Sequence, residues 1–266
     1  MPRLSVIIIT KNEAHNIGAC LDSVSFADER IVIDSGSSDA TVAICQKYTD
    51  KILVTNWPGD GPQKNRALAM ATGDWILCLD ADERVTHALK KEILSTIQHT
   101  NKHGFTIPYI STYCGKPLYC GDWRGEKHLR LFRRSYGIFS QDVVHCHVQL
   151  KGTLGALQSP ILHHPFRNLE TLLAKMNDYS TGSAQRKLEQ GKHASIWTAL
   201  THGIWAFVRG YFLKLGFLDG REGFMLAVSN AEGTYYRYLK LMLLAEKKND
   251  ATSTRLNVSP RFRSKT

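Results

Sequence analysis

One stretch of this chain constrains its fold more than any other. Residues 75–80 form a nearly unbroken apolar run, which ends in Asp80 and Asp82. Such a run predicts a strand buried on both faces, as in a parallel sheet covered by helices. Ligands of open α/β sheets bind outside the carboxyl ends of the strands, so both aspartates are expected at a ligand crevice. Alternate residues of an extended segment point the same way, which makes the pair candidate ligands of one Mg²⁺ or Mn²⁺ ion. Alternatively, they only begin the turn before the next helix.

Strand and helix patterns alternate through the first part of the chain. Apolar, β-branched runs predict strands, and apolar residues at helical spacing predict helices. Strands are expected at 4–10, 30–34, 51–57 and 75–80, with helices at about 17–24, 41–48 and 63–71 between them. This order predicts a mostly parallel, Rossmann-like doubly wound sheet with helices on both faces. Polar residues end three of these strands and together indicate a nucleotide crevice: Thr10, Asn12 and Glu13; Asp34; and Asp80 and Asp82.

The pattern changes after Asp82. A helix is expected at 86–99, followed by strands at 104–110, 128–133, 143–149 and 161–164. Residues 168–245 are helical in pattern, with breaks near Gly191 and at 216–223, and the chain after Lys247 is polar and basic. These changes predict a sheet domain over 1–165, a helical region over 166–247 and a disordered tail over 248–266.

Charge and cysteine usage limit the possible partners and the compartment. The net charge of +10 indicates an anionic partner, which is nucleotide phosphate, nucleic acid or an anionic membrane surface. The six cysteines are scattered, and Met1-Pro2-Arg3 leads directly into a strand without a secretory pattern. Reduced thiols in a cytoplasmic compartment are therefore expected. The longest charge-free apolar stretch, residues 194–208, is short for a membrane span but suits the membrane interface.

Two kinds of cation are candidates for binding phosphate. Lys64 is expected at the start of a helix after a Gly/Pro loop, and a helix N-terminus with an ammonium group is an anion site. Guanidinium groups also suit phosphate oxygens, so Arg130 or Arg133 is expected to reach the pyrophosphate of a nucleotide sugar. Asp34 is expected to accept hydrogen bonds from uracil or ribose, or else to cap its own turn.

Several blocks of sequence resemble family 2 glycosyltransferases. Four of them occur in order within residues 4–84, and later blocks are similar to the branch that contains lipopolysaccharide core glucosyltransferases. The blocks are Leu4–Glu13, Val32–Thr41, Gln63–Ala67, Leu79–Glu83, Leu129–Arg134, Ile161–Pro165, Gly216–Gly220 and Tyr238–Leu241.

The resemblance implies a GT-A fold, a divalent metal ion and inversion at the anomeric carbon. It implies a UDP-sugar donor, with glucose expected, and an inner-core sugar of lipid-linked lipopolysaccharide as acceptor. An enzyme with that acceptor is expected at the inner face of the cytoplasmic membrane. By this analogy the nucleoside is held by Thr10, Asn12, Glu13 and Asp34, and the phosphates by Lys64 with Asp80, Asp82 and the metal ion.

The chain departs from the branch at one position. Cys146 follows Val144 and His145 where the branch commonly has glutamate, the natural candidate for the general base. An inverting transfer needs a base to take the proton of the acceptor hydroxyl. The replacements considered are Asp142, Glu126, Asp122 and His145, with Asp142 or Glu126 favoured; alternatively the protein is impaired or uses an altered acceptor. His145 and His147 would share a strand face, but their spacing is unlike that of a zinc site.

Two other classes of function fit part of the pattern. A sugar nucleotidyltransferase also combines a doubly wound sheet with a metal ion, but its first strand should lead into a Gly-rich loop, which Lys11-Asn12-Glu13 is not. A non-catalytic binder of nucleic acid or anionic surfaces would account for the net charge. The basic and aromatic C-terminal part, which includes Trp197, Trp205, Arg209 and Lys214, suits either a lipid-anchored acceptor or a helical subdomain packed on the sheet.

Overall fold

The computed structural model describes residues 2–143 and 146–257. The chain divides into two compact units. The sheet unit contains Met1–Thr112 and Gly125–Pro165, and the helical unit contains Tyr113–Arg124 and Phe166–Thr266. After Pro165 the chain leaves the sheet unit for the helical unit. The transfer of Tyr113–Arg124 to the helical unit has no signal in the sequence.

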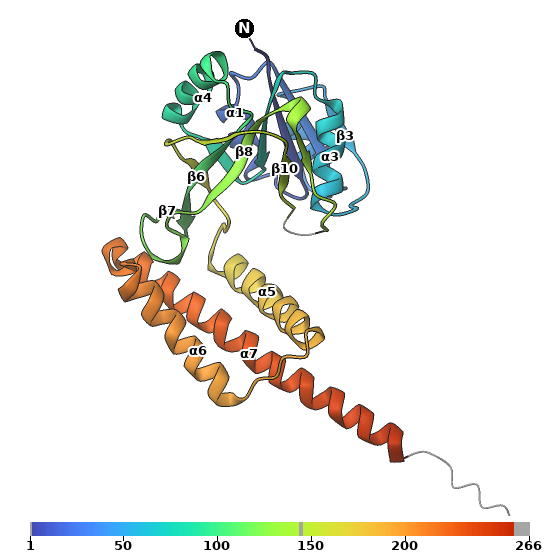
Figure 1. The fold of residues 1–266 in the computed structure, drawn as a ribbon, viewed down its shortest axis with the longest axis vertical. Helices are drawn as coiled ribbons and strands as arrows, with labels where there is room; N and C mark the ends of the chain where they lie inside the picture. The colour runs from blue at the N-terminus through green and yellow to red at the C-terminus, as the bar shows by residue number, and fades with distance from the viewer. Residues whose placement is uncertain (1, 144–145, 258–266) are drawn as a thin grey trace, which may run out of the picture. The chain divides into compact units, whose positions relative to one another are not determined.

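The sheet unit is built on a doubly wound α/β sheet (Figure 1). Its strands follow the order β3-β2-β1-β4-β8-β6-β12-β5. The strands β1 (Leu4–Thr10), β2 (Glu29–Asp34), β3 (Ile52–Val54) and β4 (Trp75–Asp80) are mutually parallel, and β8 (Lys127–Arg133) is antiparallel to β4. The rest of the sheet comprises β5 (Glu83–Val85), β6 (Gly104–Tyr113), β11 (Leu154–Ala156) and β12 (Ile161–His163). Short strands β9 (Gly137–Phe139) and β10 (Val148–Leu150) form a separate pair.

Helices cover both faces of this sheet, and alternation along β1 assigns residues to each face. Val6 and Ile8 pack with α1 (Ile17–Ser23), α2 (Thr41–Cys45) and α4 (His87–His99), while Ile7 packs on the other face with α3 (Asp60–Met70). Figure 1 shows α3 and α4 on opposite sides of the sheet. The buried β-branched side chains of β1 therefore contribute to two apolar cores, which hold the strand ends in a fixed register. This is the mostly parallel α/β fold that the sequence predicts.

One local difference from the sequence prediction lies at α3. The Gly/Pro segment was expected to be a loop, but the helix already begins at Asp60 and includes Gly61 and Pro62 in its first turn, where proline is tolerated. A Cβ on Gly61 would lie 1.8 Å from the carbonyl oxygen of Ser140. Glycine thus allows the loop before β10 to approach the start of α3. The backbone carbonyls of this loop at Asp142 and Val143 accept hydrogen bonds from the first amides of α3.

The helical unit is a bundle of three α-helices, labelled in Figure 1. They are α5 (Leu169–Glu189), α6 (Ile196–Val208) and α7 (Gly220–Asn257), joined with a π-turn at Arg209–Leu213 and a 3₁₀ turn at Gly216–Asp219. The inserted segment carries β7 (Lys116–Pro117) and a 3₁₀ turn, Gly121–Trp123. Because α7 continues to Asn257, the first part of the predicted tail is helical, and residues 258–266 lie outside the described part. No described helix has the length and apolarity needed to cross a bilayer.

Candidate active site

The ends of β1, β2 and β4 meet at one edge of the sheet unit. The register places Thr10 beside Asp34 and Ile9 beside Asp80. A pocket of about 240 Å³ opens at this edge, and its lining includes Thr10, Lys11, Glu13, Ser35, Trp57, Asp80 and Asp82. Thr10, Glu13, Asp80 and Asp82 thus come together in one pocket, because neighbouring parallel strands present their carboxyl ends on the same side. Asn12 and Asp34 are not among the residues that line it.

The β1 and β2 ends form a preorganised polar rim. Both carboxylate oxygens of Asp34 are used within its own turn, where they accept hydrogen bonds from the amides of Gly36 and Ser37 and from the Ser37 hydroxyl. Asn12, at φ +55°, accepts from the amide of Ser38 and so ties the β1 end to the β2 end. In contrast, the Oγ1 atom of Thr10 is buried and has no partner among the described residues. An orphaned hydroxyl in a pocket wall indicates a place for a ligand atom.

Asp80 stands between two buried cations. Its carboxylate lies 2.8 Å from Lys64 Nζ and 2.7 Å from an Arg130 guanidinium nitrogen. The side chains of Lys64 and Arg130 are only 9% and 12% exposed, whereas that of Asp80 is 35% exposed. Burial by itself would raise the pKa of Asp80, but Arg130 and Lys64 outweigh it and lower the pKa. The carboxylate is therefore ionised, and it holds both cations beside it.

Glu83 is a site residue that the sequence prediction does not identify. It is buried and accepts hydrogen bonds from Arg130 at 2.6 Å, from the Tyr109 hydroxyl at 2.9 Å and from the Asp80 amide at 3.0 Å. Burial raises the pKa of Glu83, and Arg130 opposes that rise. Glu83 therefore fixes the guanidinium rather than the ligand. The position of Glu83 directly after Asp82 does not predict its contact with Arg130. That contact depends on the pairing of β5 with β12.

Asp82 is the carboxylate best placed to bind a metal ion. It is held loosely, with His163 Nε2 at 3.5 Å, and lines the same pocket as Asp80 and Glu13. Among the described residues no group of three or more His, Cys, Asp or Glu side chains forms a metal cage. Mg²⁺ characteristically uses one or two carboxylates and completes its shell with substrate phosphates and water. The oxygen donors at this edge fit that kind of ion.

A second pocket, of about 400 Å³, shares Asp80 with the first, and Lys64 lines it. Its lining also contains Arg130, His128, Cys146 and His147. Burial raises the pKa of the Cys146 thiol to about 11, so the thiol stays protonated at neutral pH and cannot accept a proton.

Each of the two favoured base candidates contacts a histidine that lines the second pocket. Asp142 lies 3.6 Å from His147, and Glu126 lies 2.9 Å from His128. Neither carboxylate lines the pocket, but both histidines do. The sequence prediction does not assign a site role to His128.

One sequence candidate, Arg133, lies away from this site. Arg133 lies at the start of β4, beside Trp75, where its guanidinium stacks on the indole at 4.8 Å and donates to backbone carbonyls. The prediction that Arg133 reaches the donor is therefore wrong, because alternation along β8 directs it away from Arg130. Asp122 belongs to the helical unit. His145 lies outside the described residues.

The fold and this strand-end site together define a GT-A type α/β domain. The profile of Glycosyl transferase family 2 matches residues 5–148. An "Uncharacterized glycosyltransferase" of Rickettsia felis is 31% identical over 91% of this chain and 90% of its own length. The lipopolysaccharide core biosynthesis glycosyltransferase LpsC of Rhizobium meliloti is 30% identical over 86% of this chain and 87% of its own. The crystal structure of S. aureus TarS 1-349 is 16% identical, with a TM-score of 0.46 and 92% of both chains covered. The chain belongs to glycosyltransferase family 2.

Proposed function

We propose that the protein transfers a hexose, with glucose the expected unit, from a UDP-sugar to an inner-core sugar of lipopolysaccharide or a similar lipid-linked glycan, with inversion. The observation that carries this proposal is the Asp80 centre, where a carboxylate that lines both pockets is paired with two buried cations that line the second. One pocket suits the nucleoside and the other the reacting sugar. The similarity to LpsC supports a lipopolysaccharide acceptor.

Each side chain has a role in this scheme. Thr10 and Glu13 line the pocket that would hold the nucleoside, and the Trp57 indole in the same pocket offers a face for base stacking. Asn12 and Asp34 would shape this rim through their own turn contacts. Lys64 and Arg130 meet the diphosphate, which competes with Asp80 for their charge. Asp82, with Asp80, would hold Mg²⁺ or Mn²⁺. When bound, this ion neutralises phosphate charge and stabilises the departing diphosphate.

Asp142 is the better placed of the two favoured bases. The hydrogen bond from His128, with burial opposing it, lowers the pKa of Glu126 and so weakens it as a proton acceptor. Asp142 accepts a hydrogen bond from Ser140 Oγ at 2.7 Å. It lies beside His147, and His147 lines the second pocket. We infer that the proton of the acceptor hydroxyl passes to Asp142, directly or through His147.

A donor screen tests the reaction. Release of UDP from several UDP-sugars is measured with Mg²⁺ or Mn²⁺ and a truncated lipopolysaccharide acceptor. UDP-glucose is expected to be used best, and Asp82→Ala is expected to abolish turnover without unfolding the protein. Asp50→Asn, an exposed carboxylate change in the same unit, serves as the control. Undiminished turnover in Asp82→Ala would remove the metal assignment, and release of pyrophosphate instead of UDP would identify a nucleotidyltransferase.

The two base candidates are separated by matched amide variants. Asp142→Asn is expected to lower the rate constant of transfer by about 10²–10⁴-fold, the usual contribution of a general base. Glu126→Gln is expected to change it by much less. The reverse order would assign the proton to Glu126.

Binding at the inner face of the cytoplasmic membrane is the proposed location. On α6, the exposed residues Trp197, Leu200 and Ile204 follow helical spacing and form an apolar stripe, with Arg209 and Lys214 beyond the end of the helix. Apolar side chains that enter the interface and cations that meet lipid phosphates suit an anionic bilayer. Sedimentation with phosphatidylglycerol vesicles is expected for the parent protein and is expected to be lost in Trp197→Ser with Ile204→Ser.

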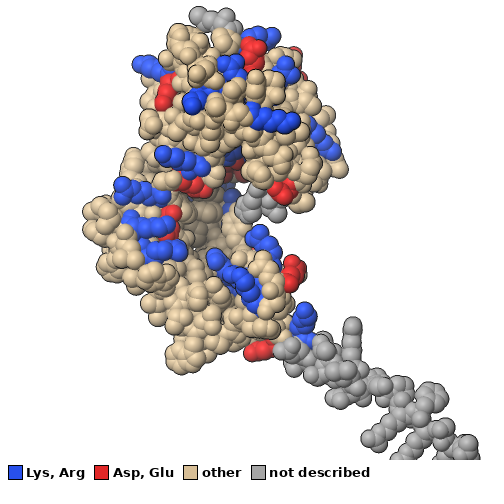
Figure 2. All heavy atoms as spheres, viewed as in Figure 1, with Lys and Arg blue, Asp and Glu red and all other residues tan. Residues whose placement is uncertain are grey.

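A binder of nucleic acid would instead need basic residues gathered along one groove with stacking aromatics. Figure 2 shows the Lys and Arg side chains of the visible face scattered among uncharged residues and interspersed with Asp and Glu. That distribution favours the enzyme over a nucleic-acid binder. Salt-sensitive RNA binding without any hydrolysis of UDP-sugars would reverse this preference.

A further inference from the structure

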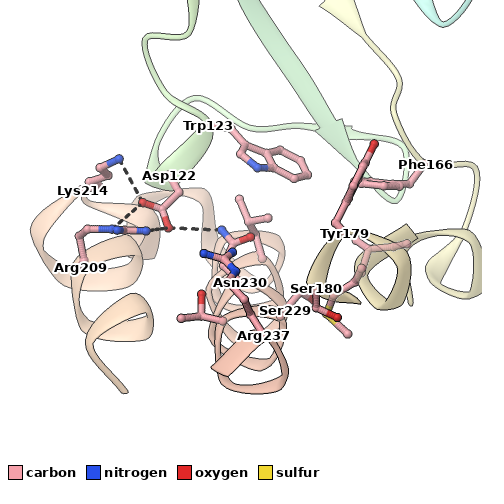
Figure 3. A pocket seen from close by; sticks show the side chains of 15 residues that line it. Asp122, Trp123, Phe166, Tyr179, Ser180, Arg209, Lys214, Ser229, Asn230 and Arg237 are labelled. Atoms are coloured by element: carbon pink, nitrogen blue, oxygen red, sulfur yellow. Dashed lines mark hydrogen bonds and ion pairs between the residues drawn. The ribbon is translucent and has the colours of Figure 1, made fainter. Parts of the chain in front are cut away.

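The helical unit contains a pocket of about 450 Å³ that the glycosyltransferase site does not use. Residues of this unit line it, from the inserted segment, α5, α7 and the π-turn after α6 (Figure 3). Its volume lies in the range of small-molecule sites.

The charge of the pocket is unbalanced. Three cationic side chains line it, Arg209, Lys214 and Arg237, whereas Asp122 is the only carboxylate among the described lining residues. Asp122 is already fully engaged: Arg209 donates two hydrogen bonds to it, and Lys214 lies 3.1 Å away. Asn230 adds a further hydrogen bond at 3.3 Å. These contacts, drawn in Figure 3, leave no oxygen of Asp122 to neutralise Arg237.

Arg237 is therefore the unusual group in this wall. It projects from α7, and its Nε atom is buried without a hydrogen-bond partner among the described residues. A buried guanidinium N–H is costly to leave unpaired, and arginine presents its donors in a planar fork that matches phosphate oxygens. An Nε without a partner, in a wall with excess positive charge, points to an oxyanion ligand.

The rest of the wall suits a sugar. Trp123 and Phe166 lie with their ring centroids 6.0 Å apart, and Tyr179 completes the aromatic side (Figure 3). Aromatic rings offer flat apolar surface to the C–H faces of a pyranose, and the hydroxyls of Ser180 and Ser229 provide polar contacts nearby. A ligand with a sugar ring and a phosphate would use both features at once.

We propose that this pocket binds a phosphorylated sugar, with Arg237 paired to the phosphate and Trp123 packed against the ring. The ligand is either a soluble sugar phosphate or the phosphorylated sugar headgroup of a glycolipid, since both present the same chemistry. The pocket would then be a second recognition site of the protein, separate from the site of transfer. The proposal does not depend on the identity of the donor or acceptor.

Calorimetric titration of the full chain with glucose 6-phosphate tests the proposal. Saturating UDP and Mg²⁺ are included to block the donor site, and direct binding is the readout, so a failed transfer assay would not affect the result. The parent protein is expected to bind glucose 6-phosphate and to bind methyl glucoside at least tenfold more weakly. Arg237→Gln is expected to weaken glucose 6-phosphate binding at least tenfold. The control Arg186→Gln, an exposed arginine on α5, is expected to bind as the parent does.

Thermal unfolding guards against a folding artefact. Because the Arg237 Nε is unpaired, Arg237→Gln is expected to unfold at or above the temperature of the parent, and glucose 6-phosphate should raise that temperature only in the parent. Phosphatidylcholine vesicles carrying diphosphoryl lipid A then distinguish the sources. If these vesicles compete with glucose 6-phosphate for the parent protein, and Arg237→Gln does not bind them, the ligand is a glycolipid headgroup. If they do not compete, the ligand is a soluble sugar phosphate. Failure of the parent to bind glucose 6-phosphate, or equal binding by Arg237→Gln, would overturn the proposal.

Discussion

The Asp80 centre makes a prediction about stability that can be worked out from its geometry. Asp80→Asn keeps the shape of the side chain but removes its charge, so Lys64 loses its hydrogen-bonded carboxylate at 2.8 Å while its own side chain remains only 9% exposed. Removing one partner of a buried pair costs about 3–5 kcal/mol. Asp80 is partly exposed, and Arg130 keeps its contact with Glu83, so we expect a loss of about 2–3 kcal/mol in the free energy of unfolding.

Thermal and urea unfolding followed by circular dichroism measure this loss. At about 2–4 °C per kcal/mol for a chain of this size, the unfolding temperature should fall by about 4–12 °C. The control Asp50→Asn should stay within about 0.5 kcal/mol of the parent. The discriminating variant is the double mutant Asp80→Asn with Lys64→Met. It should be more stable than Asp80→Asn alone, because it no longer buries an uncompensated ammonium group. A double mutant less stable than Asp80→Asn would refute the reasoning.

The same centre predicts a dependence on pH. Arg130 and Lys64 outweigh burial and lower the pKa of Asp80 below its unfolded value of about 3.9. A lowered pKa stabilises the folded state above the unfolded pKa, and that contribution is lost as the pH falls below it. The stability difference between the parent and Asp80→Asn should therefore be constant between about pH 5 and pH 8 and shrink below about pH 4. A difference that grows on acidification would contradict the sign of this shift.

Four further variants test other parts of the sheet unit. Gly61→Ala should destabilise the protein by more than about 2 kcal/mol in urea unfolding, because its Cβ would meet the Ser140 carbonyl oxygen at 1.8 Å and the backbone must move. Arg130→Met should lower UDP release at least tenfold whereas Arg133→Met should leave it within about twofold, since Arg133 packs on the indole at the far end of β4; equal losses would contradict the placement. Cys146→Glu should raise the rate of transfer, because it replaces a protonated thiol with a carboxylate in the second pocket, and an unchanged rate would leave the proton with another base.

Local patterns were enough to predict the first half of the fold. The apolar runs of β1, β2 and β4 are buried on both faces, so their sequences carry a strong strand signal, and the polar residues at their ends mark the edge where ligands bind. Thr10, Asp34, Asp80 and Asp82 could be grouped in advance, because parallel strands align their carboxyl ends whatever the details of packing. The start of α3 could not be predicted from local patterns, since it depends on a close approach between Gly61 and Ser140, which is distant in the sequence.

The sequence by itself determined the class of this protein: a doubly wound sheet whose strand ends collect carboxylates, with the blocks of a family 2 glycosyltransferase. Tertiary structure alone decided which cations serve those carboxylates. Arg130 and Arg133 are nearly adjacent in the chain, yet one contacts Asp80 and the other stacks on Trp75. The tertiary structure likewise brings Asp122 and Arg237, from distant segments of the chain, to one pocket. The physical reason is that strand and helix periodicity are local properties, whereas the pairing of buried charges depends on contacts between residues far apart in the chain.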